Sequence, residues 1–98
     1  MYTAGRNQIQ NGILTEANTE YKISLPEKVK KILIQARQYA PIKFCFTDGK
    51  SGTEYITLKP GVAYWEDDIR FVGDLYVQSP TAGTIVEVIA WYGGDFDK

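Results

Sequence analysis

Apolar and polar positions alternate along most of the chain after residue 20, with the period of two that is typical of half-buried β-strands. Clear alternations fall in residues 21–25, 42–46 and 53–59, and the last two predict a hairpin with a loop of about five residues. Residues 84–92 form the longest apolar run, interrupted only by Glu87, which predicts a central strand covered on both faces. Shorter strand signals complete the pattern at residues 62–66, 69–72 and 75–78.

The segment from residue 27 to residue 39 admits either a helix or a strand. Its Lys, Glu, Ala and Gln residues favour a helix. However, Ile32 and Ile34 fit the alternation of a strand, and Pro26 and Pro41 bracket the segment. We therefore predict a strand here.

About eight short strands follow one another, separated by turn residues roughly every 8–12 positions. This spacing predicts an all-β fold, an antiparallel β-sandwich similar to a jelly roll. The 98 residues leave room for one domain. We place the sandwich in residues 21–92, after an N-terminal arm in residues 1–20 and before a polar tail in residues 93–98.

The N-terminal arm is polar apart from three apolar residues, Ile9, Ile13 and Leu14. Such a segment is either a frayed terminus or an arm that packs on a neighbouring chain. We hypothesise the second, with Ile9, Ile13 and Leu14 as partner-interface residues. The sandwich that begins at Tyr21 is expected to fold without the arm.

The residue types that most catalytic and metal sites need are absent from the sequence. The chain has no His and a single cysteine, Cys45, so it lacks Ser–His and Cys–His pairs and the common zinc-ligand sets. Cys45 lies between two Phe residues, where a small buried side chain is expected. We expect no enzyme activity, no metal and no cofactor.

The charge of the chain bears on its partners. A formal net charge of −1 argues against nucleic acid, because phosphate contacts need an excess of Lys and Arg. The densest basic stretch, Lys28, Lys30 and Lys31, is predicted to be a solvated turn. No stretch approaches the roughly 20 apolar residues of a membrane span, and the polar N-terminus does not resemble a signal peptide. We expect synthesis in a cytoplasm and no membrane contact.

The acidic residues form one cluster in the second half of the chain. Their spacing fits neither a pair of catalytic carboxylates nor a calcium loop, and we interpret them as turn residues. The cluster consists of Glu66, Asp67 and Asp68, with Asp74 nearby.

The tryptophans and their neighbours admit a sugar-binding interpretation. Aromatic faces stack on sugar rings, and Tyr64, Trp65 and Tyr92 are candidates for such a platform. Packing in the core is the alternative for both Trp65 and Trp91, because each lies within a strand pattern. Buried indoles would favour a structural role, and exposed coplanar indoles would favour sugar binding.

Residues 21–91 resemble a group of small β-sandwich structural proteins of tailed bacteriophages. The resemblance rests on a hairpin with Leu-x-x-Gly followed by Tyr-x-Glu, which matches residues 58–66. Leu-Tyr-Val at 75–77 and a closing Ala-Gly-Thr-x-Val-Glu-Val-x-x-Trp strand at 82–91 follow it. An Ile-x-Leu-Pro element at 23–26 and a strand ending in Gln-Ala-Arg at 35–37 extend it into the first half.

The resemblance implies a virion structural protein, most concretely a capsid decoration (cement) protein on the shell. A head–tail or tail accessory protein is a second possibility within that group. The implied partners are the major capsid protein or another virion protein and sister subunits, with a trimer as the favoured homo-oligomer. A carbohydrate- or receptor-binding module is the alternative from a different functional class.

Overall fold

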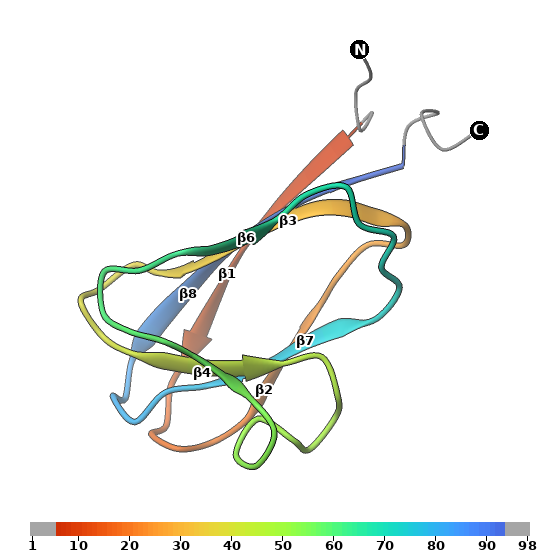
Figure 1. Ribbon diagram of the computed structural model, residues 1–98. Helices are drawn as coiled ribbons and strands as arrows, with labels where there is room; N and C mark the ends of the chain where they lie inside the picture. Colours follow the sequence, from red (N-terminus) through yellow and green to blue (C-terminus); the bar gives the residue numbers. More distant parts are fainter. Residues whose placement is uncertain (1–5, 94–98) are drawn as a thin grey trace.

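The computed structural model describes residues 6–93, which form eight β-strands and no helix (Figure 1). The expected all-β fold is confirmed. The described part contains no helix long and apolar enough to cross a membrane. The strands are β1 (Arg6–Leu14), β2 (Tyr21–Ser24), β3 (Val29–Ala36), β4 (Ile42–Cys45), β5 (Ile56–Leu58), β6 (Tyr64–Glu66), β7 (Asp74–Gln78) and β8 (Thr84–Tyr92).

The strands build two antiparallel sheets of four strands each. Sheet A has the order β1-β8-β3-β6, and sheet B has the order β2-β7-β4-β5. The chain passes from one sheet to the other at every connection except the hairpin of β4 and β5. Eight strands in two sheets with this order form a jelly roll, so the predicted β-sandwich is confirmed.

The core lies between the two sheets and is built from alternate residues of the strands. On β8, Val86, Val88 and Ala90 are buried, and Ile89 between them is only half-buried. The strand is central, since it pairs with both β1 and β3. The prediction that both of its faces are covered is wrong within residues 6–93, because one face packs on sheet B and the other faces outward.

β3 confirms the preference for a strand over a helix in the segment 27–39. Its pairing with β8 shifts register between Val29 and Lys31, which marks a bulge. Lys30, the residue at the bulge, is buried. The expectation of a solvated basic turn is therefore wrong for Lys30, because the bulge directs this side chain into the protein.

The prediction for the N-terminal arm differs most from the structure. Nine residues of it form β1, which pairs with β8 along its whole length, from Arg6 opposite Tyr92 to Leu14 opposite Thr84. Leu14 is fully buried in the core. A Cβ atom on Gly12 would lie 3.0 Å from the Ile23 side chain, so the two sheets approach closely there. Residues 6–14 thus belong to the folded domain, and residues 1–5 and 94–98 lie outside the described part.

Two predicted strands are shorter in the structure than in the prediction. The predicted strand at 69–72 reduces to one bridge, in which Phe71 and Val29 exchange backbone hydrogen bonds of 3.0 Å. The β4–β5 hairpin is confirmed, but its loop runs over residues 46–55, since β5 covers only Ile56–Leu58.

Glu20 holds the β4–β5 loop. Its carboxylate accepts hydrogen bonds from the backbone N–H of Gly49 (2.8 Å) and from the N–H and hydroxyl of Ser51 (2.9 and 2.5 Å). Burial raises the pKa of Glu20, whereas the hydrogen bonds from Ser51 and Gly49 lower it, and the net shift is downward. The segment between β1 and β2 therefore has a structural role within the sandwich.

Candidate functional site: the outer face of sheet A

One face of sheet A packs on sheet B, and the opposite face is directed away from the core. Side chains alternate between the two faces of a strand, so the neighbours of the buried residues make up the outward-directed surface. We call it the outer face of sheet A. Its members are Asn7, Ile9, Asn11 and Ile13 of β1, Ile85, Glu87, Ile89 and Trp91 of β8, Lys31, Leu33 and Gln35 of β3, and Trp65 of β6.

An apolar row crosses this face over all four strands. Ile9 lies opposite Ile89, Ile89 lies opposite Leu33, and Leu33 lies opposite Trp65. The two ends of the row are open to solvent, with Ile9 exposed by 65% and Trp65 by 54%. A second apolar pair, Ile13 with Ile85, lies nearer the C-terminal end of β1. Contiguous apolar side chains on an exposed sheet face are typical of a protein-binding surface.

A polar row of Asn11, Glu87 and Gln35 separates the apolar row from the Ile13–Ile85 pair. The Glu87 carboxylate accepts hydrogen bonds from Gln35 Nε2 (2.9 Å) and Arg37 Nε (2.7 Å). These hydrogen bonds lower the pKa of Glu87. The row therefore carries a fixed carboxylate–guanidinium pair between two apolar patches.

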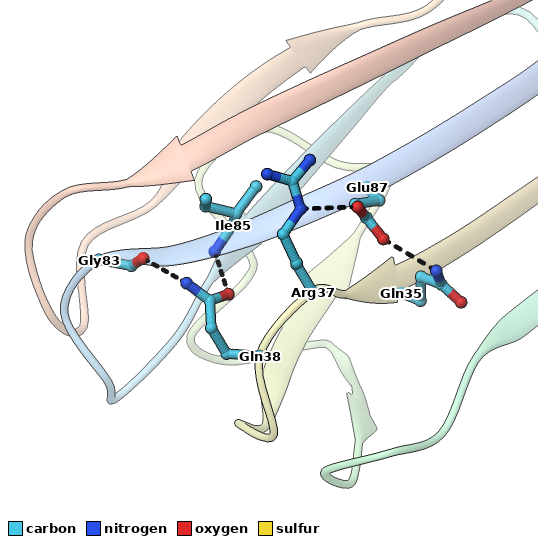
Figure 2. Close-up of polar contacts among 6 residues, drawn as sticks. All are labelled: Gln35, Arg37, Gln38, Gly83, Ile85 and Glu87. Atoms are coloured by element: carbon cyan, nitrogen blue, oxygen red, sulfur yellow. Dashed lines mark hydrogen bonds and ion pairs between the residues drawn. The ribbon is translucent and has the colours of Figure 1, made fainter.

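Gln38, which follows the end of β3, makes two further hydrogen bonds at the start of β8. Its side chain donates to the Gly83 carbonyl oxygen (3.0 Å) and accepts from the Ile85 N–H (2.8 Å), as Figure 2 shows. The backbone N–H of Arg37 also donates to the Ile85 carbonyl oxygen (2.8 Å). These bonds fix the ends of β3 and β8 relative to each other and make this part of the face rigid.

The end of the face nearest Tyr92 carries Lys31 between two tryptophans. Its Nζ lies 4.9 Å from the ring centroid of Trp91 and 5.3 Å from that of Trp65. An ammonium over an aromatic face is attracted by the negative charge of that face. Lys31 thus draws the two indoles into one cluster next to the apolar row.

The proposed interface residues of the N-terminal segment separate in the structure. Ile9 and Ile13 lie on the outer face and are exposed by 65% and 60%. Leu14 is wholly buried in the core, so its assignment as a partner-interface residue is wrong. It follows Ile13 on a strand, and successive side chains of a strand point to opposite faces.

The three residues of the candidate sugar platform do not come together. Trp65 lies on the outer face, whereas Tyr64 packs on the Phe44 ring with 5.0 Å between centroids. Tyr92 lies under the Arg6 guanidinium, which is 5.2 Å from its ring centroid. Trp65 shares its face with Trp91 instead. Lys31 over both indoles competes with a sugar ring for the same aromatic faces.

The acidic cluster is divided in the structure. Glu66, Asp67 and Asp68 are exposed at the end of β6, whereas Asp74 accepts a hydrogen bond from Leu25 N–H (3.2 Å) at the start of β7. Within residues 6–93, no three side chains of His, Cys, Asp or Glu gather as a metal site would require. Cys45 is buried and donates to the Thr47 carbonyl oxygen (3.2 Å).

Sequence reasoning missed half of the outer face. The apolar run at residues 84–92 predicts a strand covered on both faces, so Ile85, Ile89 and Trp91 do not stand out in the sequence as outward-facing residues. The signal that distinguishes them is the polar residue among them, Glu87, which marks the outward face of β8.

No family model matches the chain, and no curated protein matches it. A solved structure described as the "Solution NMR structure of a de novo designed double-stranded beta-helix" is similar, with a TM-score of 0.51 and 19% sequence identity. The match covers 87% of this chain and 96% of that one. At this identity the likeness concerns the fold alone.

Proposed function

We propose that this chain is a non-enzymatic structural protein of a tailed-phage virion, and most concretely a decoration protein that binds the capsid shell. The shell protein contacts the outer face of sheet A. The observation that carries the proposal is the apolar row of Ile9, Ile89, Leu33 and Trp65, which crosses the whole sheet, is exposed at both ends and is half-buried at Ile89 and Leu33. The sequence resemblance supplies the class of partner.

Two features of the face support protein binding. Its side chains are apolar along the row and aromatic at the end nearest Tyr92, with an Arg–carboxylate pair beside the row, and apolar, aromatic and Arg side chains are typical of protein interfaces. The face is also built on four paired strands and not on loops. A rigid apolar surface loses little conformational entropy when a partner covers it, which favours tight binding.

The proposal is tested first by the identity of the neighbouring genes and then by the binding of the chain to capsid shells. Genes for capsid and portal proteins should flank the gene of this chain. Empty shells assembled from that capsid protein are then mixed with the purified chain and sedimented. We expect the chain to sediment with the shells, to saturate at a fixed ratio to the capsid protein, and to raise the melting temperature of the shells.

Variants locate the binding surface. The double variant Leu33→Glu with Trp65→Glu places two charges in the apolar row, and we expect it to lose at least about tenfold in affinity, because buried unpaired charges are costly. The matched control is Ile56→Glu, which changes an exposed isoleucine on sheet B (55% exposed). Circular dichroism checks that both variants fold. Unchanged shell binding by the folded double variant, or no binding by the wild type, would contradict the proposal.

Sugar binding is the second candidate, and the exposure of Trp65 next to Trp91 favours it. Under this proposal Lys31 moves off the two indole faces, the indoles stack on a sugar ring, and Lys31 donates hydrogen bonds to the sugar hydroxyl groups. Glycan-array binding that is lost in Trp65→Ala and retained in Leu33→Glu would support this function. Shell binding that needs Leu33 would favour the first proposal.

A further inference from the structure

β1 is an edge strand of sheet A, and no strand of residues 6–93 pairs with its outer side. Ile85 uses its backbone N–H and C=O toward Gln38 and Arg37, on the β3 side of β8. Backbone groups alternate in direction along a strand, so Thr84 and Val86 turn theirs toward β1. The β1 residues between the bonded positions, Asn7, Ile9, Asn11 and Ile13, therefore direct their N–H and C=O groups toward the open edge.

This edge differs from the other three edges of the sandwich. β2, β5 and β6 contain four, three and three residues, whereas β1 contains nine. Natural edge strands are protected by shortness, Lys, Pro or bulges. β1 has no Lys and no Pro, it pairs with β8 without a register shift, and Arg6 at its start is its only charged residue. A long, unprotected edge of this kind is a template for pairing with another strand.

The sequence of β1 suits pairing with a second β1 strand that runs antiparallel to it and has its Asn11 opposite the first Asn11. In this arrangement each Ile9 lies opposite the Ile13 of the second copy, and each Gln10 lies opposite a Gly12. The residues brought face to face also have their backbone groups directed to the free edge, as an antiparallel ladder requires.

We propose that β1 pairs antiparallel with β1 of a second copy of this chain, with Asn11 on the two-fold axis. The two A sheets then form one continuous sheet of eight strands. The exposed Ile9 and Ile13 of both copies cover one another as cross-strand pairs. The dimer joins the two outer faces into one surface. It does not depend on the proposed function, and it differs from the trimer that the sequence resemblance implies.

Cysteine cross-linking of the full chain tests both the edge and the register. In the proposed ladder the two Asn11 Cα atoms are about 5.5 Å apart, a separation that suits a disulfide. We expect Asn11→Cys to form a covalent dimer on mild oxidation. Ile9→Cys and Ile13→Cys should each stay monomeric on a denaturing gel, whereas an equimolar mixture of the two should cross-link. Cys45 is buried and does not compete.

Light scattering on the uncrosslinked protein gives an independent measurement. The wild type should dimerise in a concentration-dependent manner. Ile9→Lys adds a charge to the edge and should weaken the dimer at least about tenfold, and the control Ile56→Lys on β5 should dimerise as the wild type does.

Four results would overturn the dimer. They are a wild type that stays monomeric, an Asn11→Cys variant that folds without cross-linking, an Ile9→Cys variant that cross-links as well as Asn11→Cys does, and pairing of β1 only with an added shell protein. These outcomes are separate from those of the capsid test. A monomer that binds shells contradicts the dimer alone, and a dimer that binds no shell contradicts only the proposed function.

Discussion

The Glu87 carboxylate accepts hydrogen bonds from one side chain of the neighbouring strand β3, Gln35, and from Arg37, the first residue after that strand. Gln35 and Arg37 donate to separate oxygens of the carboxylate. Because both donors favour the charged form, the pKa of Glu87 is lowered from its ordinary value of 4.5. A carboxylate with a lowered pKa in the folded state stabilises the fold at pH values above its ordinary pKa, and this contribution is lost as the pH falls through the folded-state pKa.

The first prediction concerns Glu87→Gln and the pH dependence of stability. The amide keeps one acceptor oxygen but lacks the charge, so the variant should unfold at a lower temperature than the wild type at about pH 7. The difference should shrink as the pH falls below about 4.5 and vanish once the pH is below the folded-state pKa of Glu87. Thermal unfolding followed by circular dichroism over this range measures it. The same difference at both ends of the range would show that the charge of Glu87 does not contribute. Glu20→Gln is the comparison for the second carboxylate whose pKa is lowered.

At the scale of the element, β1 is part of the fold. It covers one edge of the central strand β8, and its last residue, Leu14, fills the core. Gln10, in the middle of the strand, also joins β1 to the rest of the fold, because its side chain donates a hydrogen bond to the Ser24 carbonyl oxygen at the end of β2. β1 thus ties sheet A to sheet B at their common edge.

The second prediction is that removal of residues 1–14 prevents stable folding. Without β1, the long apolar strand β8 becomes an edge, and exposed edges of this kind aggregate. Within the full chain, Leu14→Ala should cost about 2–5 kcal/mol of unfolding free energy, which is typical of a buried leucine. Ile56→Ala is the control, because Ile56 lies on β5 of sheet B, is exposed by 55% and its loss should be nearly neutral. Denaturant unfolding measures all three. A truncated chain with the same denaturation midpoint as the wild type would contradict this prediction.

The strands that could be predicted from the sequence are those whose buried positions are apolar. β3, β4 and β8 have buried residues two apart, such as Ile32 and Ile34, and the period of two is visible. β1 was missed because its inward positions before Leu14 are Gln8, Gln10 and Gly12. Gln10 is satisfied there by the carbonyl oxygen of Ser24, a contact between residues distant in sequence that no local pattern reveals.

The candidate site could be predicted only in part, for a related reason. Ile9 and Ile13 stood out because they are apolar residues in a polar segment. Leu33 and Ile89 did not, because an apolar residue beside a buried strand position looks the same whether its own face is covered or open. The register across β1, β8, β3 and β6 is what joins them into a row, and register is a property of the assembled sheet.

At the scale of the whole molecule, the two ends of the described chain lie side by side in sheet A, with Arg6 opposite Tyr92. The nine residue pairs of β1 and β8 form the longest register of either sheet, and they join the segments that lie farthest apart in sequence. Folding rates fall when the contacts of a protein join distant segments, because the loop between them must be closed first. The β1–β8 pairing is therefore expected to slow the folding of this sandwich.

The third prediction tests this by circular permutation. The permutant joins residue 98 to residue 1 and opens the chain between Gly61 and Val62, which are exposed in the turn between β5 and β6. β8 and β1 then become a hairpin linked by the eleven residues 93–98 and 1–5. The pairs of β3 with β6 and of β4 with β7 become more distant, but they are only three each. The mean sequence separation thus falls, and refolding should be several-fold faster. Stopped-flow tryptophan fluorescence measures the rate, with circular dichroism as the check that the fold is kept. A permutant of equal stability that refolds no faster would mean that the β1–β8 pairing forms after the rate-limiting step.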